Sequence, residues 1–173
     1  MHPQRISAFL LGGWILGSLF MIFVAIQNFR MADFLGNSET HALLRDMAGR
    51  LNQVFFVNWE RAELVLGVVL TAVLLLGVRN RWQAILSGVL LILVAVQHFG
   101  VTPQMLALSA HLDNAATAEQ FGKLHAAYGV LEVVKLAGAF ALAILLLPSW
   151  RGRRADIDQV QTIDYAHHSH IDG

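Results

Sequence analysis

Four long apolar segments constrain the fold of this chain more than any other feature. They cover residues 6–26, 64–78, 82–96 and 129–147. A helix needs about 20 mostly apolar residues to cross the hydrocarbon core of a bilayer, and each segment reaches that length with its flanking residues. With 56% hydrophobic and 14% charged residues among 173, the composition is far from that of soluble proteins. The sequence therefore predicts an all-α, polytopic membrane protein, a four-transmembrane-helix bundle.

The apolar segments also predict the domain organisation. We expect one transmembrane domain over residues 1–150, followed by a flexible cytoplasmic tail over residues 151–173, because the tail is polar throughout. Within the domain, the expected spans cover about residues 6–27, 58–78, 82–98 and 128–147.

The long segment between the first two spans shows helical periodicity. Its apolar residues recur at intervals of three and four, at Leu43, Leu44, Met47, Leu51, Val54 and Phe55. Ser38 is suited to cap the start of such a helix. We therefore expect an amphipathic helix over about residues 38–56, lying on the outer membrane surface before the chain turns into the second span. Between the third and fourth spans, we expect a turn at Pro103 and then a short helix.

Basic residues predict the orientation. Arg5 precedes the first span, Arg79 and Arg81 fill the tight turn between the second and third, and Arg151 follows the fourth. In a four-span chain these positions share one side of the membrane, and Lys and Arg are enriched in short cytoplasmic segments. We expect a multi-pass protein of the bacterial cytoplasmic (inner) membrane, with both termini in the cytoplasm.

Several classes of chemistry find no support in the sequence. The chain has no cysteine, which excludes disulfides, thiolate metal sites and cysteine nucleophiles. Its formal net charge is zero, so nucleic acid is not an expected partner. No phosphate-binding loop, nucleophile elbow or H-E-x-x-H motif occurs, and the sequence favours a protein that is not an enzyme.

The candidate site lies on the fourth span, within the stretch "LHAAYGVLEVVKLAG". His125, Tyr128, Glu132 and Lys135 are three, four and three residues apart, which places them along one stripe of a helix. A charge at the bilayer centre costs about 2.5–3.5 kcal/mol on insertion scales, so Glu132 and Lys135 are expected to face the bundle interior near Glu63. In this arrangement His125 and Tyr128 line the route to the outer surface.

Two interpretations of this cluster stay open. It could bind a proton, ion or small ligand, or the Glu132–Lys135 pair could only fix the helix register. For Glu60, Arg61 and His125, a position at the membrane interface with the polar group in water is the competing interpretation.

Two further sets of residues are candidates for binding or packing. His98 and His125, at the outer ends of the third and fourth spans, could ligate a metal ion or haem as neutral imidazoles, although solvated histidines are the alternative. Gly13 and Gly17 in "GWILG" are four residues apart, a spacing that allows another helix to approach closely.

Three stretches carry a resemblance to a known group. "GGWILGSLF", "RDMAGRLNQVFFVNW" and "FGKLHAAYGVLEVVKL" resemble a bacterial four-helix membrane domain of unknown function, which has eukaryotic transmembrane relatives and a loose similarity to CopD-type copper-resistance proteins. The resemblance covers roughly residues 6–147 and implies Phe121, His125 and Tyr128 as pattern residues. The family often has a proline-containing stretch near the end of the first span, where this chain reads "VAIQNF". The resemblance implies a fold and a topology, and no reaction.

Taken together, the residues favour an accessory or assembly component of a membrane complex, whose partners are the bilayer and other membrane subunits or a second copy. The first alternative is binding or transport of an ion, proton or small ligand through the outer His/Glu/Lys cluster. The second is haem or copper binding through His98 and His125.

Overall fold

The computed structural model describes residues 3–77, 80–112 and 114–147, and within these residues every element is helical. The elements are α1 (Pro3–Leu35), α2 (His41–Gly77), α3 (Arg81–Val96), the π-helical segment η1 (Gln97–Val101), α4 (Thr102–Ser109) and α5 (Ala115–Leu146). The predicted tail over residues 151–173 lies outside the described residues.

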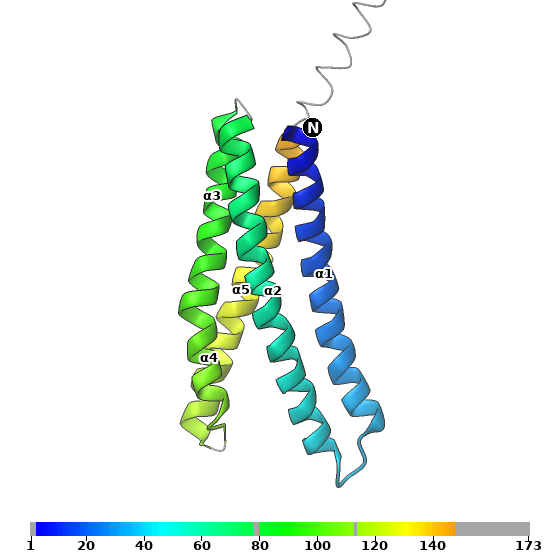
Figure 1. Ribbon diagram of the computed structural model, residues 1–173. Helices are drawn as coiled ribbons and strands as arrows, with labels where there is room; N and C mark the ends of the chain where they lie inside the picture. Colours follow the sequence, from blue (N-terminus) through cyan, green and yellow to red (C-terminus); the bar gives the residue numbers. More distant parts are fainter. Residues whose placement is uncertain (1–2, 78–79, 113, 148–173) are drawn as a thin grey trace, which may run out of the picture.

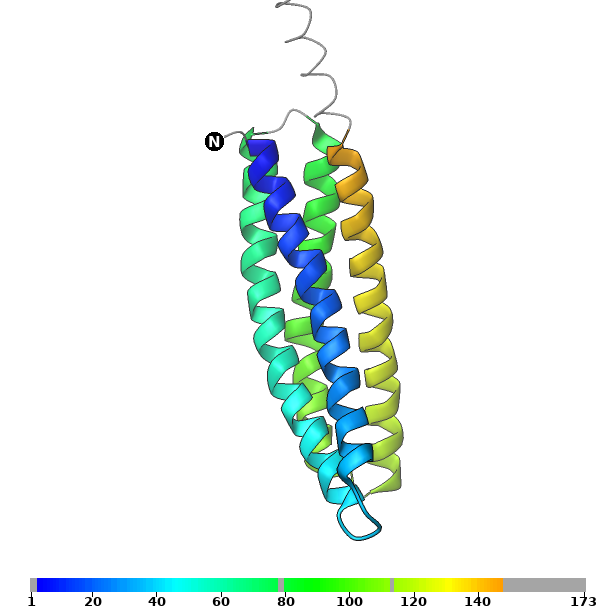
Figure 2. The same cartoon turned by 90° about the vertical axis from the view of Figure 1, so that its right-hand side faces the viewer.

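Four long rods run side by side (Figures 1 and 2). The start of α1, the end of α2 and the end of α5 lie at one end of the bundle, and the α1–α2 loop lies at the other. The α3–η1–α4 run forms the fourth rod. α1 packs against α2 and α5, and α3 packs against the same two helices, so α2 and α5 occupy diagonally opposite corners. A contact between α2 and α5 therefore has to pass through the centre of the bundle.

The prediction of a separate amphipathic helix over residues 38–56 is wrong. α2 continues without a break from His41 to Gly77. Its buried residues follow one stripe along this whole length, from Ala48 and Asn52 through Glu60 and Glu63 to Leu74. Because neither proline nor a pair of glycines interrupts the segment, nothing in the sequence turns the helix near residue 57.

The predicted N-cap at Ser38 is also wrong. The helix begins at His41, and the turn before it is closed by Asn37 and Thr40. The Asn37 side-chain oxygen accepts a hydrogen bond from the Thr40 backbone N–H at 2.9 Å, and Thr40 Oγ1 accepts one from the Asn37 N–H at 3.1 Å. These reciprocal bonds satisfy backbone groups that precede the first helical turn.

The predicted turn at Pro103 is replaced by a widened helical turn. α3 passes directly into η1 and then into α4, so the chain stays helical from Arg81 to Ser109. Pro103 has no N–H to donate to the carbonyl four residues earlier, and its ring would collide with that carbonyl in a regular helix. The π-segment accommodates this, because the Thr102 N–H bonds instead to the carbonyl of Gln97, five residues back. The short helix expected after Pro103 is present as α4.

The fourth span predicted at 128–147 corresponds to the second part of a longer helix. α5 begins at Ala115, where the side chain of Asn114 accepts a hydrogen bond from the Ala116 N–H at 2.9 Å. This is the expected role of Asn at a helix N-cap. His125 and Tyr128 consequently lie inside a continuous helix and not at its end.

The distribution of side chains differs from that in a soluble bundle in its apolar exterior and in the number of polar residues buried beside the hydrophobic core. Large apolar residues face outward, among them Phe9 (81% exposed), Phe99 (71%) and Leu76 (89%). Polar and charged residues are buried inside, including Ser18, Asn52, Glu60, Glu63, Gln83, Ser87, Gln97 and Lys135. Three helical runs, Pro3–Leu35, Arg81–Ser109 and Ala115–Leu146, are long and apolar enough to cross a membrane. The fourth, α2, carries Glu60, Arg61 and Glu63 in its middle.

The two glycines predicted to support packing behave differently. Gly17 lies against the indole ring of Trp59 on α2, so a Cβ at this position would overlap the ring. Among the described residues, no atom of another helix lies within 4 Å of the position that a Cβ would take at Gly13, which is exposed. Of these two glycines, Gly17 alone therefore supports helix packing.

Substitution of Gly17 by Ala is expected to lower the free energy of unfolding by about 1–3 kcal/mol, because the added methyl group displaces Trp59 from a packed interface. Gly13→Ala, on the same helix, is the matched control and should not destabilise the protein. Thermal unfolding followed by circular dichroism in detergent measures both variants. An equal loss in the two would contradict the packing assigned to Gly17.

Candidate functional site

Lys135 of α5 lies at the centre of a buried ion-pair network. Its Nζ donates hydrogen bonds to Glu63 Oε2 at 2.5 Å and to Glu132 Oε1 at 2.8 Å. The side chains of Lys135 and Glu63 are 2% and 0% exposed, and that of Glu132 is 11% exposed. Glu63 comes from α2 and Lys135 from the opposite corner, so this ion pair spans the diagonal of the bundle. The contact that the sequence predicts between these residues is confirmed.

The two remaining corners of the bundle complete the network. On α1, Trp14 Nε1 and Ser18 Oγ both donate to Glu63 Oε1, at 2.8 and 3.1 Å. These residues are four apart and therefore share one face of the helix. On η1, Gln97 Nε2 donates to Glu132 Oε1 at 2.9 Å. All four rods thus contribute a polar side chain to one central cluster, and each charge receives several hydrogen bonds.

Glu60 forms a second acidic group beside the Glu63–Lys135–Glu132 network. Glu60 of α2 is fully buried, with its Oε2 2.9 Å from His98 Nδ1 and its Oε1 accepting a hydrogen bond from Thr102 Oγ1 at 2.7 Å. His98 is the partly exposed member, with 18% of its side chain accessible. The prediction that Glu60 keeps its carboxylate in water at the interface is therefore wrong.

The segment η1 contacts both acidic groups. Gln97 and His98 are adjacent and point to different neighbours, so that Gln97 contacts Glu132 on α5 and His98 contacts Glu60 on α2. Thr102, five residues after Gln97, joins His98 in contacting Glu60. π-segments of this kind change which residues face inward, and they frequently occur at functional sites.

Two buried polar atoms in this region have no hydrogen-bond partner among the described residues, Tyr128 Oη and Gln97 Oε1. Tyr128 is 8% exposed and packs edge-to-face against Phe56, with ring centroids 5.8 Å apart. The carboxyl groups of Glu60 and Glu132 lie near the Tyr128 hydroxyl group. Because buried polar groups are almost always hydrogen-bonded to protein or ordered water, these atoms mark a place for water.

The charges of the cluster do not balance. Within the described part of the chain, it contains three carboxyl groups, those of Glu60, Glu63 and Glu132, against one lysine and one histidine. Even with His98 protonated, one negative charge remains in surroundings of low dielectric constant. An uncompensated buried charge is costly, and a bound proton or small cation removes it.

The structure separates His125 from this cluster. His125 is exposed and stacks on Phe121 of its own helix, with ring centroids 6.0 Å apart and planes 10° from parallel. Of the residues predicted to line a route to the surface, Tyr128 belongs to the cluster and His125 does not. Arg61 is exposed, as expected for an interfacial residue.

The arrangement does not support the predicted His98–His125 ligand pair for haem or metal. His98 directs Nδ1 toward Glu60, whereas His125 contacts Phe121. In the described ranges no group of three or more His, Asp or Glu side chains is arranged to hold a metal ion.

Sequence analysis missed several members of the cluster. These members are neutral residues in or beside apolar segments, and neither charge nor spacing marked them as site residues: Trp14, Ser18, Gln97 and Thr102. Glu60 and Glu63 are three residues apart on one face of α2, and this spacing could have indicated that both point inward. Gln97 and Thr102 are five residues apart, a spacing that aligns in the π-segment and not in an α-helix.

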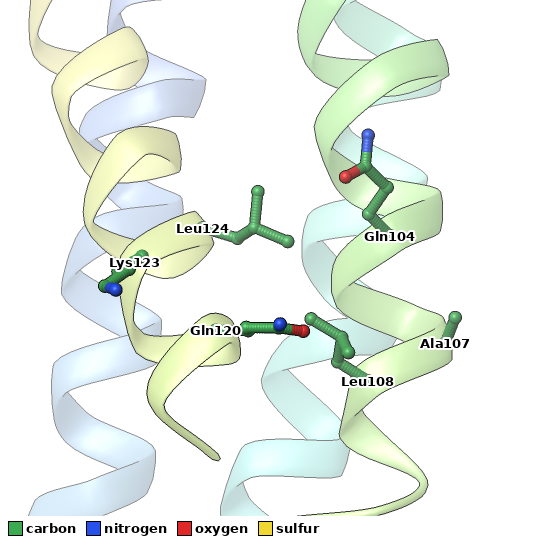
Figure 3. A pocket seen from close by; sticks show the side chains of 6 residues that line it. All are labelled: Gln104, Ala107, Leu108, Gln120, Lys123 and Leu124. Atoms are coloured by element: carbon green, nitrogen blue, oxygen red, sulfur yellow. The ribbon is translucent and has the colours of Figure 1, made fainter. Parts of the chain in front are cut away.

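A pocket of about 450 Å³ opens elsewhere, between α4 and α5 near the turn that joins them (Figure 3). Gln120 of α5 and Leu108 of α4 point toward each other across it (Figure 3). The lining residues are Gln104, Ala107, Leu108, Gln120, Lys123 and Leu124. None of them belongs to the central cluster, so the pocket is a separate, open and largely apolar feature.

Comparison with protein families, curated proteins and solved structures finds no match to this chain. Within the described residues, every regular element is helical and three helical runs are long and apolar enough to span a membrane. The interior holds the buried ionisable residues Glu60, Glu63 and Lys135.

Replacing Lys135 by Met should lower the free energy of unfolding by about 3–5 kcal/mol, because two buried carboxylates lose their shared cation. Lys123→Met is the matched control: Lys123 pairs with Glu119 on the exposed face of the same helix, and its loss should cost less than about 1 kcal/mol. Thermal or denaturant unfolding in detergent measures the difference. The double variant Glu63→Gln/Lys135→Met should recover part of the loss, and a single variant as stable as wild type would contradict the buried ion pair.

Proposed function

We propose that this protein is a four-span integral membrane protein that binds a proton, or a small cation in its place, within the Glu63–Lys135–Glu132 network. The observation that carries this proposal is one buried lysine shared by two carboxylates inside a bundle whose exterior is apolar. Ionisable residues in such a position mark proton and ion pathways in membrane proteins. The bacterial cytoplasmic membrane is the proposed location, and the resemblance to a four-helix membrane domain is in keeping with it.

The depth of the network supports this proposal. Depth can be counted along each helix from the end of the bundle at which α1 begins, at about 1.5 Å per residue. On this scale the network lies roughly 21–24 Å from that end, at Ser18, Glu63, Gln97 and Glu132. The hydrocarbon core of a bilayer is about 30 Å thick. With this end of the bundle at the inner surface, the network lies in the outer half of the membrane, at one common level. Between it and the inner end lie core residues including Leu11, Leu70, Leu74, Leu90 and Leu142, together with the buried polar residues Ser7, Gln83 and Ser87.

Within the network, Glu63 and Glu132 have different roles. Glu63 is fully buried and both of its oxygens accept hydrogen bonds, from Trp14 and Ser18 on one and from Lys135 on the other. Both oxygens of Glu63 are therefore already engaged by donors. The hydrogen bonds to Glu132 from Gln97 and Lys135 both reach Oε1. We therefore assign the exchangeable proton to Glu132 Oε2.

The proposed topology can be tested in the cysteine-free chain by introducing single cysteines. In intact cells, a thiol probe that cannot cross the membrane should label Ala115→Cys, at the start of α5, but not Asn80→Cys, before α3. Disruption of the membrane should make Asn80→Cys reactive. The reverse pattern would invert the orientation, and labelling of both positions in intact cells would contradict membrane-spanning helices.

The proposed proton site can be tested by infrared spectroscopy of the full-length protein in detergent or lipid. A carboxylic acid C=O band should respond to pH in the wild type and disappear in Glu132→Gln, which keeps the shape of the side chain while removing the exchanging group. Glu119→Gln, on the exposed face of α5, is the control and should keep the band. A stable Glu132→Gln variant with an unchanged band would exclude Glu132 as the proton carrier, and absence of a band from the wild type would exclude the proposed function.

A second candidate function is the accessory or assembly role that the sequence favours. One observation supports it: an exposed apolar stripe on the part of α2 that precedes Glu60, formed by Leu43, Met47, Leu51, Val54 and Phe55. On a bundle this long, the stripe extends beyond the expected outer limit of the hydrocarbon core and is available to another membrane subunit. Purification in mild detergent should then give a particle larger than one chain, which Met47→Ser/Leu51→Ser reduces to a single chain.

A further inference from the structure

We propose that Glu60 and His98 form a second proton-binding site, connected to Glu132 by water held between the Tyr128 hydroxyl group and the Gln97 side-chain carbonyl. The connection to Glu132 rests on the proposed function, whereas the Glu60–His98 site does not. The two sites together form a path along which a proton moves from the outer side of the bundle to the central network.

The first argument is that Glu60 has no permanent cation beside it. The groups that face it are His98 of η1, Thr102 of α4, and Tyr128 with the more distant Glu132 of α5. On its own helix, Glu63 is engaged by Lys135 and Arg61 is exposed. His98 is therefore the one group among the described residues that can neutralise Glu60. Since imidazole is the side chain that gains and loses protons near neutral pH, this pair can exchange a proton.

The second argument is the position of the His98 ring. Its Nδ1 is directed to Glu60, so its Nε2 lies on the other side of the ring. The side chain is 18% exposed, whereas that of Glu60 is 0% exposed. A proton that binds Nε2 produces an imidazolium, which can release its Nδ1 proton to Glu60 and return to the neutral form. Each transfer moves one proton and leaves no charge unaccounted for.

The third argument is that unpartnered polar atoms lie near both acids. Tyr128 Oη and Gln97 Oε1 are buried and have no hydrogen-bond partner in the part of the chain that the structure describes. The Tyr128 hydroxyl group lies near the carboxyl groups of Glu60 and Glu132, and the amide of Gln97 is bonded to Glu132. A water molecule needs two to four polar partners, and these atoms with the two carboxyl groups supply them.

The positions of the two sites along the bundle agree with a proton path that runs from the outer side to the central network. Glu60 and His98 lie roughly 26 Å from the inner end at 1.5 Å per residue, farther than Glu63 and Glu132. They are therefore nearer the outer surface than the central network. The adjacent residues Gln97 and His98 of η1 contact one acid each, which makes the widened turn the structural link between the sites.

The second site is tested by nuclear magnetic resonance of the full-length protein labelled with ring-¹⁵N histidine, with the His98 signal assigned by its loss in His98→Asn. In Glu60→Gln, the ¹⁵N signal of His98 Nδ1 should shift, because Nδ1 loses its carboxylate partner. The exposed His125 is the internal control, and its ring signals should not shift. An unchanged Nδ1 signal of His98 in Glu60→Gln would overturn the second site.

The connection is tested by following the Glu132 infrared band after a rapid pH jump. Tyr128→Phe should slow protonation of Glu132 by about a hundredfold or more, the effect of removing a positioned proton-transfer group, while leaving the final band intensity unchanged. Phe56→Leu disturbs the packing of Tyr128 without removing its hydroxyl group and should retain the wild-type rate.

The outcomes separate the two proposals. A wild-type rate in Tyr128→Phe would overturn the connection while leaving the Glu132 site in place. A wild-type protein without a Glu132 band would overturn the proposed function and the connection together. The shift of His98 in Glu60→Gln would still establish the second site in that case.

Discussion

The ion pair between Lys135 and Glu63 is the interaction on which the rest of the bundle depends. It joins helices at opposite corners, so its geometry requires α1 and the α3–η1–α4 run to pack on either side of it. Isolated charges in an apolar interior are strongly unfavourable, and the pair is tolerable because Trp14, Ser18 and Glu132 supply further hydrogen bonds and charge. Breaking it removes more than one contact, since each remaining charge is then left without compensation.

The π-segment has a local cause and a distinct place in the tertiary structure. Its cause is local, because Pro103 cannot complete a regular helical turn with the residues before it. Its place in the tertiary structure is beside the buried carboxyl groups, which Gln97, His98 and Thr102 contact. The segment that a proline disturbs is thus the one that links the two acidic groups.

The exterior and the interior of the bundle impose opposite demands on its side chains. Outward-facing Phe9, Leu76 and Phe99 are unfavourable in water and suited to lipid, where apolar surface carries no penalty. With hydrophobic burial between helices weakened in such surroundings, hydrogen bonds and close packing provide specificity. Thr71 bonded to Ser87, Gln83 bonded to the Leu145 carbonyl, and Trp59 seated on Gly17 are examples.

The amino-acid pattern was enough to predict the helical class, the apolar segments and the stripe that brings Glu132 and Lys135 together, because each follows from composition or from helical spacing within one segment. The pairing of Lys135 with Glu63 was also predictable, since a buried cation needs an acid at the same depth. Other features became visible in the folded bundle: α2 is unbroken, Glu60 is buried, His125 faces away, and Gln97 and Thr102 join the cluster. These features depend on which helices become neighbours and on a widened turn that shifts the register by one residue. Apart from the three-residue spacing of Glu60 and Glu63, these contacts between separate helices leave no periodic trace in the sequence.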